Sequence, residues 1–247
     1  MATYLRHMQR STDLFAAAGH RRTSCGQGLN LVVGLIAAGC YERALEVGTG
    51  LLAKVRRLHL ASREAFALCL LSNAKLELHE LDEAESLAHE ALAALAGGEG
   101  HSRQRGLAEM ILGRVATLRG DYDASRARLE AALVSFAATP PYRVHTLGAL
   151  AENELRAGQP KEALLHAEAA AALAVEVGVG GASLGAIATA RAEALLALGR
   201  ADAARDVVEQ AVTKLRTRAG GFSDAWLRER YLAIRPHRRL LELAELL

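Results

Sequence analysis

Apolar residues recur along this chain three or four positions apart, which is the spacing of one face of an α-helix. The stretch from Leu112 to Phe136 shows the pattern most clearly, as two amphipathic segments joined at Gly120. Glycine suits the end of a helix because it enters the left-handed conformation without a Cβ clash. Alternating runs of β-branched and aromatic residues, which are typical of strands, are scarce. The pattern therefore predicts a helical hairpin here and an all-α chain.

The hairpin recurs about every 40 residues. Aligning the turns between first and second helices places the junctions at Gly39, His79, Gly120, Gly158 and Gly199. Five residues later each copy has a small side chain, namely Ala44, Ala84, Ser125, Ala163 and Ala204. Small residues at a fixed place allow two antiparallel helices to approach closely. One hairpin cannot bury its apolar face alone, so the repetition predicts hairpins that stack on one another.

The predicted elements begin with a lone helix, Tyr4–Ala18, which Gly19 ends. Five hairpins follow, with helices expected over 22–38 and 41–58, 61–78 and 82–95, 103–118 and 122–136, 142–156 and 160–177, and 183–198 and 201–218. A loop is expected at 97–100, and Pro140 and Pro141 suit a helix start, where their missing N–H groups have no helical partner. We expect one domain, 1–247, divided into 1–19, 20–59, 60–100, 101–139, 140–179, 180–220 and 221–247.

The last predicted segment is a helix capped by Ser223, a break at Pro236 and a final helix, His237–Leu247. The final helix carries an apolar stripe of Leu240, Leu241, Leu243, Ala244 and Leu247. A capping helix should be polar outside. We expect the stripe to lie on the fifth hairpin, and a homodimer formed through this C-terminal helix stays open as the alternative.

The repeat resembles the tetratricopeptide repeat (TPR). The matching features are a leucine followed by a small residue in the first helix (Leu150 and Ala151, for example), the glycine at the junction, and two small residues in the second helix. Three departures occur, His79 for glycine, Ser125 for alanine and Arg191 for leucine. The resemblance implies a right-handed α-solenoid of about five TPR-like hairpins with an extra helix at each end. It also implies a module that binds proteins or peptides.

The period of about 40 residues resembles a long-helix variant of this repeat found in large bacterial signalling proteins. The two ends, FAAAGHRR and SDAWLRERYLAIRPHRRLLELA, look like the C-terminal repeat region of multidomain Ser/Thr kinase or ATPase regulators of the myxobacterial type. Within the second end, Asp224, Arg228, Leu232, Pro236 and Leu240 match that pattern. No kinase motif occurs in this chain, so any such domain would lie elsewhere.

Composition and charge narrow the expected partners. Of 247 residues, 51% are hydrophobic and 4% aromatic, and the formal net charge is +2, so nothing at the level of the whole chain demands nucleic acid or a membrane. The basic clusters at 21–22, 54–57 and 235–239 are short and are interpreted as solvated helix ends, with an anionic protein partner as the alternative. Three cysteines in apolar helical patterns and no signal peptide predict a cytoplasmic protein.

One motif favours an enzyme. Residues 181–185, GASLG, satisfy the G-x-S-x-G pattern of a hydrolase nucleophile elbow, and Asp202 and His237 follow Ser183 in the hydrolase order. The elbow requires a parallel sheet beneath it, which the rest of the chain does not predict. The same residues fit a loop between hairpins with Ser183 as helix N-cap. We therefore expect no enzyme and no catalytic residue, with a serine hydrolase as an unfavoured alternative.

The other chemical motifs are incomplete. His79-Glu80 and His89-Glu90 each begin the zinc pattern H-E-x-x-H but lack its second histidine. The glycine-containing stretch 48–54 lacks the G-K-[ST] ending of a phosphate-binding loop and lies inside a predicted helix. We expect neither a metal nor a cofactor.

The binding surface is expected on the first helices, because in this repeat class they line the concave face. Counting back from the junctions predicts five inward residues, namely Phe66, Asn73, Arg114, His145 and Glu152. Asn73, Arg114 and Glu152 share one position in successive repeats and are suited to hydrogen-bonding an extended peptide. Solvation of the groove, or an Arg114–Glu152 pair, is the alternative.

The function predicted from the sequence is a non-catalytic scaffold or sensory module of a bacterial signalling system, which binds a protein or peptide. The first alternative is a peptide-pheromone-type receptor that acts as a ligand-controlled switch.

Overall fold

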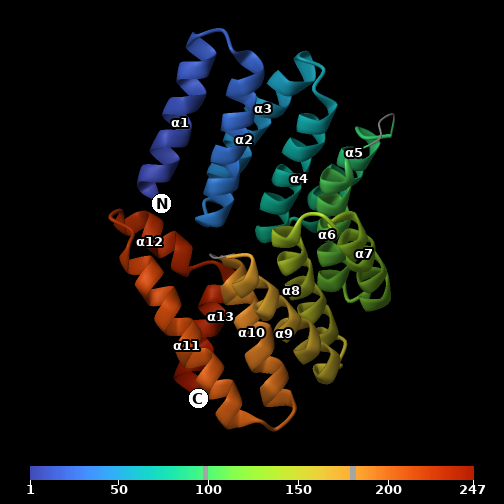
Figure 1. Ribbon diagram of the computed structural model, residues 1–247, viewed down its shortest axis with the longest axis vertical. Coiled ribbons are helices and arrows are strands. Elements are labelled where there is room, and N and C mark those ends of the chain that lie inside the picture. The colour runs from blue at the N-terminus through green and yellow to red at the C-terminus, as the bar shows by residue number, and fades with distance from the viewer. Residues whose placement is uncertain (97–99, 179–181) are drawn as a thin grey trace. The chain divides into compact units, whose positions relative to one another are not determined.

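The computed structural model describes residues 1–96, 100–178 and 182–247, without the side chains of Ala182 and Ser183. This described part contains thirteen α-helices and no strand, so the prediction of an all-α solenoid is confirmed (Figure 1). Of the predicted loop at 97–100, only Gly100 belongs to the described residues.

The helices alternate as the repeat predicts. α1 spans Ala2–Ala17. The first helices of the five hairpins are α2 (Arg21–Ala37), α4 (Ala61–Glu77), α6 (Ser102–Arg119), α8 (Pro140–Arg156) and α10 (Ala182–Ala197). The second helices are α3 (Tyr41–Arg57), α5 (Leu81–Ala93), α7 (Tyr122–Ser135), α9 (Pro160–Glu176) and α11 (Ala201–Gly220). The tail contains α12 (Ala225–Leu232) and α13 (Arg235–Leu246).

The packing gathers into two compact units. Unit 1 comprises Met1–Leu112 and Phe222–Arg230, and unit 2 comprises Gly113–Gly221 and Tyr231–Leu247. The chain changes unit three times: inside α6, between Gly221 and Phe222, and inside α12. The predicted boundaries of a single domain stay a prediction.

The junctions fall where the alignment placed them. Gly39, Gly120, Gly158 and Gly199 all have φ between +73° and +84°, which is the left-handed region that glycine enters at no steric cost. His79 takes the same conformation at φ +61° although it has a Cβ. The histidine is therefore a strained substitute for glycine in an otherwise regular turn.

Replacing His79 with glycine is expected to stabilise the fold by about 1 kcal/mol, because the left-handed strain disappears. The free energy of unfolding, measured by urea denaturation with circular dichroism, checks this. Gly120→Ala is the matched opposite change, since it adds a Cβ at φ +84°, and it should lose a similar amount. A loss of stability in His79→Gly would contradict the account.

The small residues after each junction are buried without exception. Ala44, Ala84, Ser125, Ala163 and Ala204 expose none of their surface. The hairpin of α6 and α7 shows why size matters there: a Cβ added to Gly113 would lie 2.7 Å from Leu129 Cγ and 3.2 Å from the Ser125 carbonyl oxygen. In the fifth hairpin, Arg191 replaces the repeat's leucine, and its Nη2 lies 3.6 Å from Glu168 Oε1 of α9.

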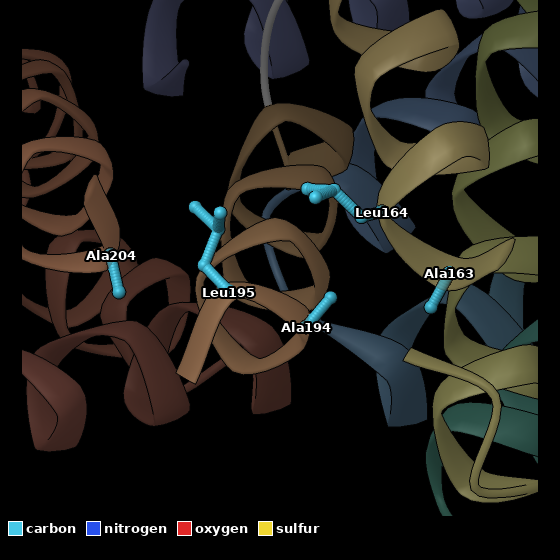
Figure 2. Packing of buried hydrophobic residues seen from close by; sticks show 5 residues of the cluster. All are labelled: Ala163, Leu164, Ala194, Leu195 and Ala204. Atoms are coloured by element: carbon cyan, nitrogen blue, oxygen red, sulfur yellow. The ribbon is translucent and has the colours of Figure 1, made fainter. Parts of the chain in front are cut away.

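Alanine and leucine alternate in the core of the last hairpins. Leu164 of α9, Leu195 of α10 and Ala204 of α11 belong to one buried cluster with Ala163 and Ala194 (Figure 2). The leucines fill the space between helices that the alanines allow to lie close together. Leu247 at the end of the chain packs against the edge of this cluster.

The tail differs from the sequence prediction at two places. Asp224, not Ser223, caps α12, because its Oδ1 accepts a hydrogen bond from the Leu227 amide at 3.1 Å. Pro236 does not break the helix but lies in the first turn of α13, where a missing N–H costs no hydrogen bond. The break falls just before Arg235, between α12 and α13.

α13 packs on α10 and α11, as α10 packs on α8 and α9, so it takes the place of a further first helix. The ring of His237, in the first turn of α13, is buried against α10. A Cβ added to Gly185 of α10 would lie 2.4 Å from His237 Cδ2. His237 Nδ1 lies 2.7 Å from the Tyr231 carbonyl oxygen, and Thr189 donates a hydrogen bond to the Pro236 carbonyl oxygen at 3.1 Å.

Much of the apolar stripe of α13 is used inside unit 2. Leu240 and Leu243 are buried, and Leu247 packs on the core cluster. Ala244 and the neighbouring Leu246 remain exposed.

Candidate functional site

Three inner helices of unit 2 bring polar side chains together in one shallow depression. Arg114 of α6 and Glu152 of α8 occupy the same repeat position, six residues before their junctions. Both line the depression, and so does Arg235 from the start of α13. The remaining lining residues are Thr117, Leu118 and Ala149. The structure therefore brings two of the five predicted groove residues to one place.

Glu152 is shared between two arginines. Its Oε1 lies 3.2 Å from Arg235 Nη2 and 3.2 Å from Nη2 of Arg156, one turn further along α8. The three side chains are between 31% and 41% exposed, so solvent screens both pairs and neither adds much stability. Among the residues that line the depression, two arginines, Arg114 and Arg235, accompany one carboxylate, that of Glu152.

A buried polar network adjoins the depression at Thr117. Thr117 of α6 donates a hydrogen bond to Asn153 Oδ1 of α8 at 3.1 Å, and its hydroxyl lies 2.7 Å from the Ser125 hydroxyl of α7. Asn153 in turn donates to the Tyr122 carbonyl oxygen at 3.1 Å. Asn153 and Ser125 are fully buried. The network ties α6, α7 and α8 together, and α6 and α8 are the helices that carry Arg114 and Glu152.

His145, another predicted residue, lies near Arg114 in unit 2. Desolvation by the surrounding helices, and secondarily the positive charge of Arg114, lower the pKa of His145 to about 4. Its side chain nevertheless keeps exposed surface, so a ligand can reach it. At neutral pH His145 is uncharged and offers one donor and one acceptor.

The pKa of His145 has a consequence for stability. Because its folded value of about 4 lies below its ordinary value of 6.5, the unfolded chain binds this proton more readily. The free energy of unfolding should be unaffected by His145 above pH 6.5 and should fall as the pH drops through the window to about 4. In His145→Gln, the free energy of unfolding measured by urea denaturation should fall less steeply over this pH range.

Arg114→Ala should raise the pKa of His145, because the positive charge of Arg114 lowers it in the wild type. NMR titration of His145 measures this, and an unchanged pKa would show that the charge of Arg114 does not act on His145.

Phe66 and Asn73 belong to unit 1. The ring of Phe66 is half-buried, and the guanidinium carbon of Arg103 lies 5.6 Å from its centroid, a cation–π contact. Asn73 is half-buried on α4. Their role in binding stays a prediction, and the site built here uses only unit 2.

Arg235 is a residue that the sequence interpretation missed. It belongs to the basic cluster 235–239, which was expected only to solvate a helix end. The basic cluster was the only sequence feature that could have pointed to Arg235. Its partner Glu152 lies 83 residues away in the sequence. Arg239 of the same cluster reaches Glu193 Oε1 of α10 at 2.6 Å, and Glu193 shares the repeat position of Glu152.

The hydrolase alternative receives little support. Gly181 and the side chain of Ser183 lie outside the described residues. Asp202 is fully exposed and pairs with Arg205, whereas His237 is buried beside Tyr231. In the described ranges there is no strand on which an elbow would rest.

Among the residues that the structure describes, no three His, Cys, Asp or Glu side chains are grouped to hold a metal ion. None of the helices described is long and apolar enough to span a membrane.

Neither a protein-family model nor a curated protein matches this chain. Solved structures do. BtubC (BKLC) from P. vanneervenii superposes with a TM-score of 0.62 at 15% identity, over 90% of this chain and 93% of that one. A Rap protein complexed with competence and sporulation factor gives a TM-score of 0.62 at 13% identity, over 98% of this chain and 72% of that one.

A putative kinesin light chain from Podosopora anserina, with nearly identical TPR-like repeats, gives a TM-score of 0.53 at 20% identity, over 77% of this chain and 94% of that one. At such identities the likeness concerns the fold alone. The fold is that of TPR-like repeat proteins.

Proposed function

We propose that this chain is a non-catalytic module that binds a protein or peptide through the depression of unit 2. The observation that carries the proposal is the convergence of Arg114, Glu152 and Arg235 on one depression, next to a buried hydrogen-bond network. Partly exposed arginines are suited to a carboxylate, either a chain terminus or an acidic side chain. His145 beside them is suited to a neutral hydrogen-bonding group of the same ligand.

Similar folds support a binding role without defining the partner. The Rap protein was solved in complex with competence and sporulation factor, so a chain of this architecture holds a ligand there. A finer part of the proposal is that this module serves a bacterial signalling system in the cytoplasm. It rests on the two chain ends, which resemble the repeat regions of Ser/Thr kinase or ATPase regulators.

The test is a peptide array that presents free carboxyl termini and acidic side chains, probed with the purified chain. Arg114→Ala should weaken binding of the selected peptides about tenfold or more, since a charge-assisted hydrogen bond contributes roughly 1.5–3 kcal/mol. Arg216→Ala is the matched control, because Arg216 is exposed on the second helix α11. An unchanged set of peptides with unchanged affinities in Arg114→Ala would refute the proposal.

A ligand-controlled switch is the second candidate, and one contact favours it. Arg235 lines the depression and also attaches α13 to Glu152. A ligand carboxylate that engages Arg235 competes with Glu152 and so loosens the start of α13. Hydrogen exchange of the α13 amides separates the two candidates: a scaffold leaves their exchange unchanged on binding, whereas a switch accelerates it.

A further inference from the structure

α1 packs against α2 in the way that the second helix of a hairpin packs against the next hairpin. It packs extensively on α2, as α3 packs on α4 (Figure 1). It ends at Gly19 with φ +78°, as α9 ends near Gly178 with φ +67°. The equivalent helix α3 buries five residues, while α1 buries none.

α3 shows which side of such a helix its own first helix covers. Leu51 of α3 packs into α2 at Gly28, where an added Cβ would lie 2.6 Å from Leu51 Cδ2. One repeat period earlier, Leu51 corresponds to Ser11 of α1. The uncovered side of α1 is therefore the side on which Ser11 lies.

This side is hollowed and partly apolar. His7, Ser11, Leu14 and Ala18 line the hollow, and their spacing of four, three and four residues defines one helical face. Leu14 is 60% exposed there. Three turns of helix with an exposed leucine at the centre match the length and shape of another helix lying in the groove.

The positive charge near the hollow favours an acidic partner. Arg10 also lines it, and Arg6, Arg21 and Arg22 are exposed nearby in the sequence. Asp13 is the only acidic residue among the first 41, and its carboxylate accepts a hydrogen bond from Gln9 Nε2 at 3.0 Å. An acidic occupant gains attraction along this face and a basic one is repelled.

We propose that the face of α1 formed by His7, Arg10, Ser11, Leu14 and Ala18 docks an acidic amphipathic helix of a partner protein. The apolar side of the partner helix lies on Leu14, and its carboxylates lie beside Arg6 and Arg10. A helix is favoured over an anionic membrane because the apolar side chains line a hollow rather than a protruding ridge. The inference is independent of the ligand proposed for unit 2.

The test uses a fluorescent peptide of about 18 residues, or five helical turns, with leucine along one face and glutamate on both flanks. Its binding to the full chain is followed by anisotropy. Wild type should bind it, and a peptide with lysine in place of every glutamate should bind at least about tenfold more weakly. Leu14→Asp and Arg10→Glu should each weaken the glutamate peptide by a similar factor. Both side chains are exposed, so circular dichroism should show an unchanged fold.

Leu165→Asp is the matched control, since Leu165 is 67% exposed on α9 of unit 2, and it should bind like wild type. Arg114→Ala should also bind this peptide normally, which separates this proposal from the one for unit 2. Equal binding of the two peptides, no binding, or no difference between Leu14→Asp and Leu165→Asp overturns the proposal. So does a Leu14-dependent self-association in sedimentation, or Leu14-dependent binding to phosphatidylserine vesicles in place of the peptide.

Discussion

Phe136→Ala is expected to destabilise the protein by about 3–5 kcal/mol, the range for removing a buried aromatic side chain. Phe136 ends α7 and exposes none of its surface. Its ring stacks on Tyr142 of the next hairpin, with centroids 5.1 Å apart and planes 18° apart. Truncation leaves a cavity between two consecutive hairpins, so the loss falls on their interface. Urea denaturation followed by circular dichroism measures it.

Val134→Ala is the control for Phe136→Ala. Val134 lies two residues earlier in α7 and is 78% exposed, so its truncation should change the free energy of unfolding by less than about 0.5 kcal/mol. If Phe136→Ala lost no more than Val134→Ala, the ring would not belong to the core between these hairpins.

Leu195→Ala is expected to cost about 2–5 kcal/mol. Leu195 is buried in the cluster of Figure 2, between Leu164 of α9 and Ala204 of α11. Alanines line much of this cluster, so few side chains can move in to fill the cavity. Because Leu247 packs on the same cluster, amide exchange at the end of α13 should also accelerate.

Leu165→Ala provides the comparison for Leu195→Ala. Leu165 is 67% exposed on α9, next to Leu164 in sequence, and its truncation should leave both stability and exchange nearly unchanged. Faster exchange along α13 in both variants alike would show that the cluster does not hold the tail.

The repeat pattern predicted the helices and their turns well because both depend on neighbours in sequence. Gly39 and Gly120 mark helix ends through their own backbone freedom, and the alignment extended the assignment to His79, which takes the same φ without being glycine. Ala44 and Ala163 were recognisable as buried because close helix pairs admit only small side chains at that place.

The tail was predicted less accurately. Two adjacent residues, Ser223 and Asp224, were both able to cap α12, and the choice depends on which oxygen reaches the Leu227 amide. A proline such as Pro236 can either break a helix or lie in its first turn. Here α13 packs on α10 and α11, and Pro236 lies in its first helical turn.

The candidate site shows the same division. The sequence placed Arg114 and Glu152 at one repeat position, and the structure puts them in one depression. It could not supply Arg235, because an arginine's partner depends on where a distant helix packs. The sequence also could not predict the lowered pKa of His145, because that pKa depends on desolvation by surrounding helices.

By itself, then, the sequence determined the all-α architecture, the repeat period and the turns, because helix periodicity and left-handed glycines are local properties. Only the tertiary structure decided that α13 takes the place of a further first helix, that Arg235 meets Glu152 across 83 residues, and that α1 keeps one face uncovered. Those features follow from which surfaces meet, and burial, pairing and exposure are properties of the packed chain.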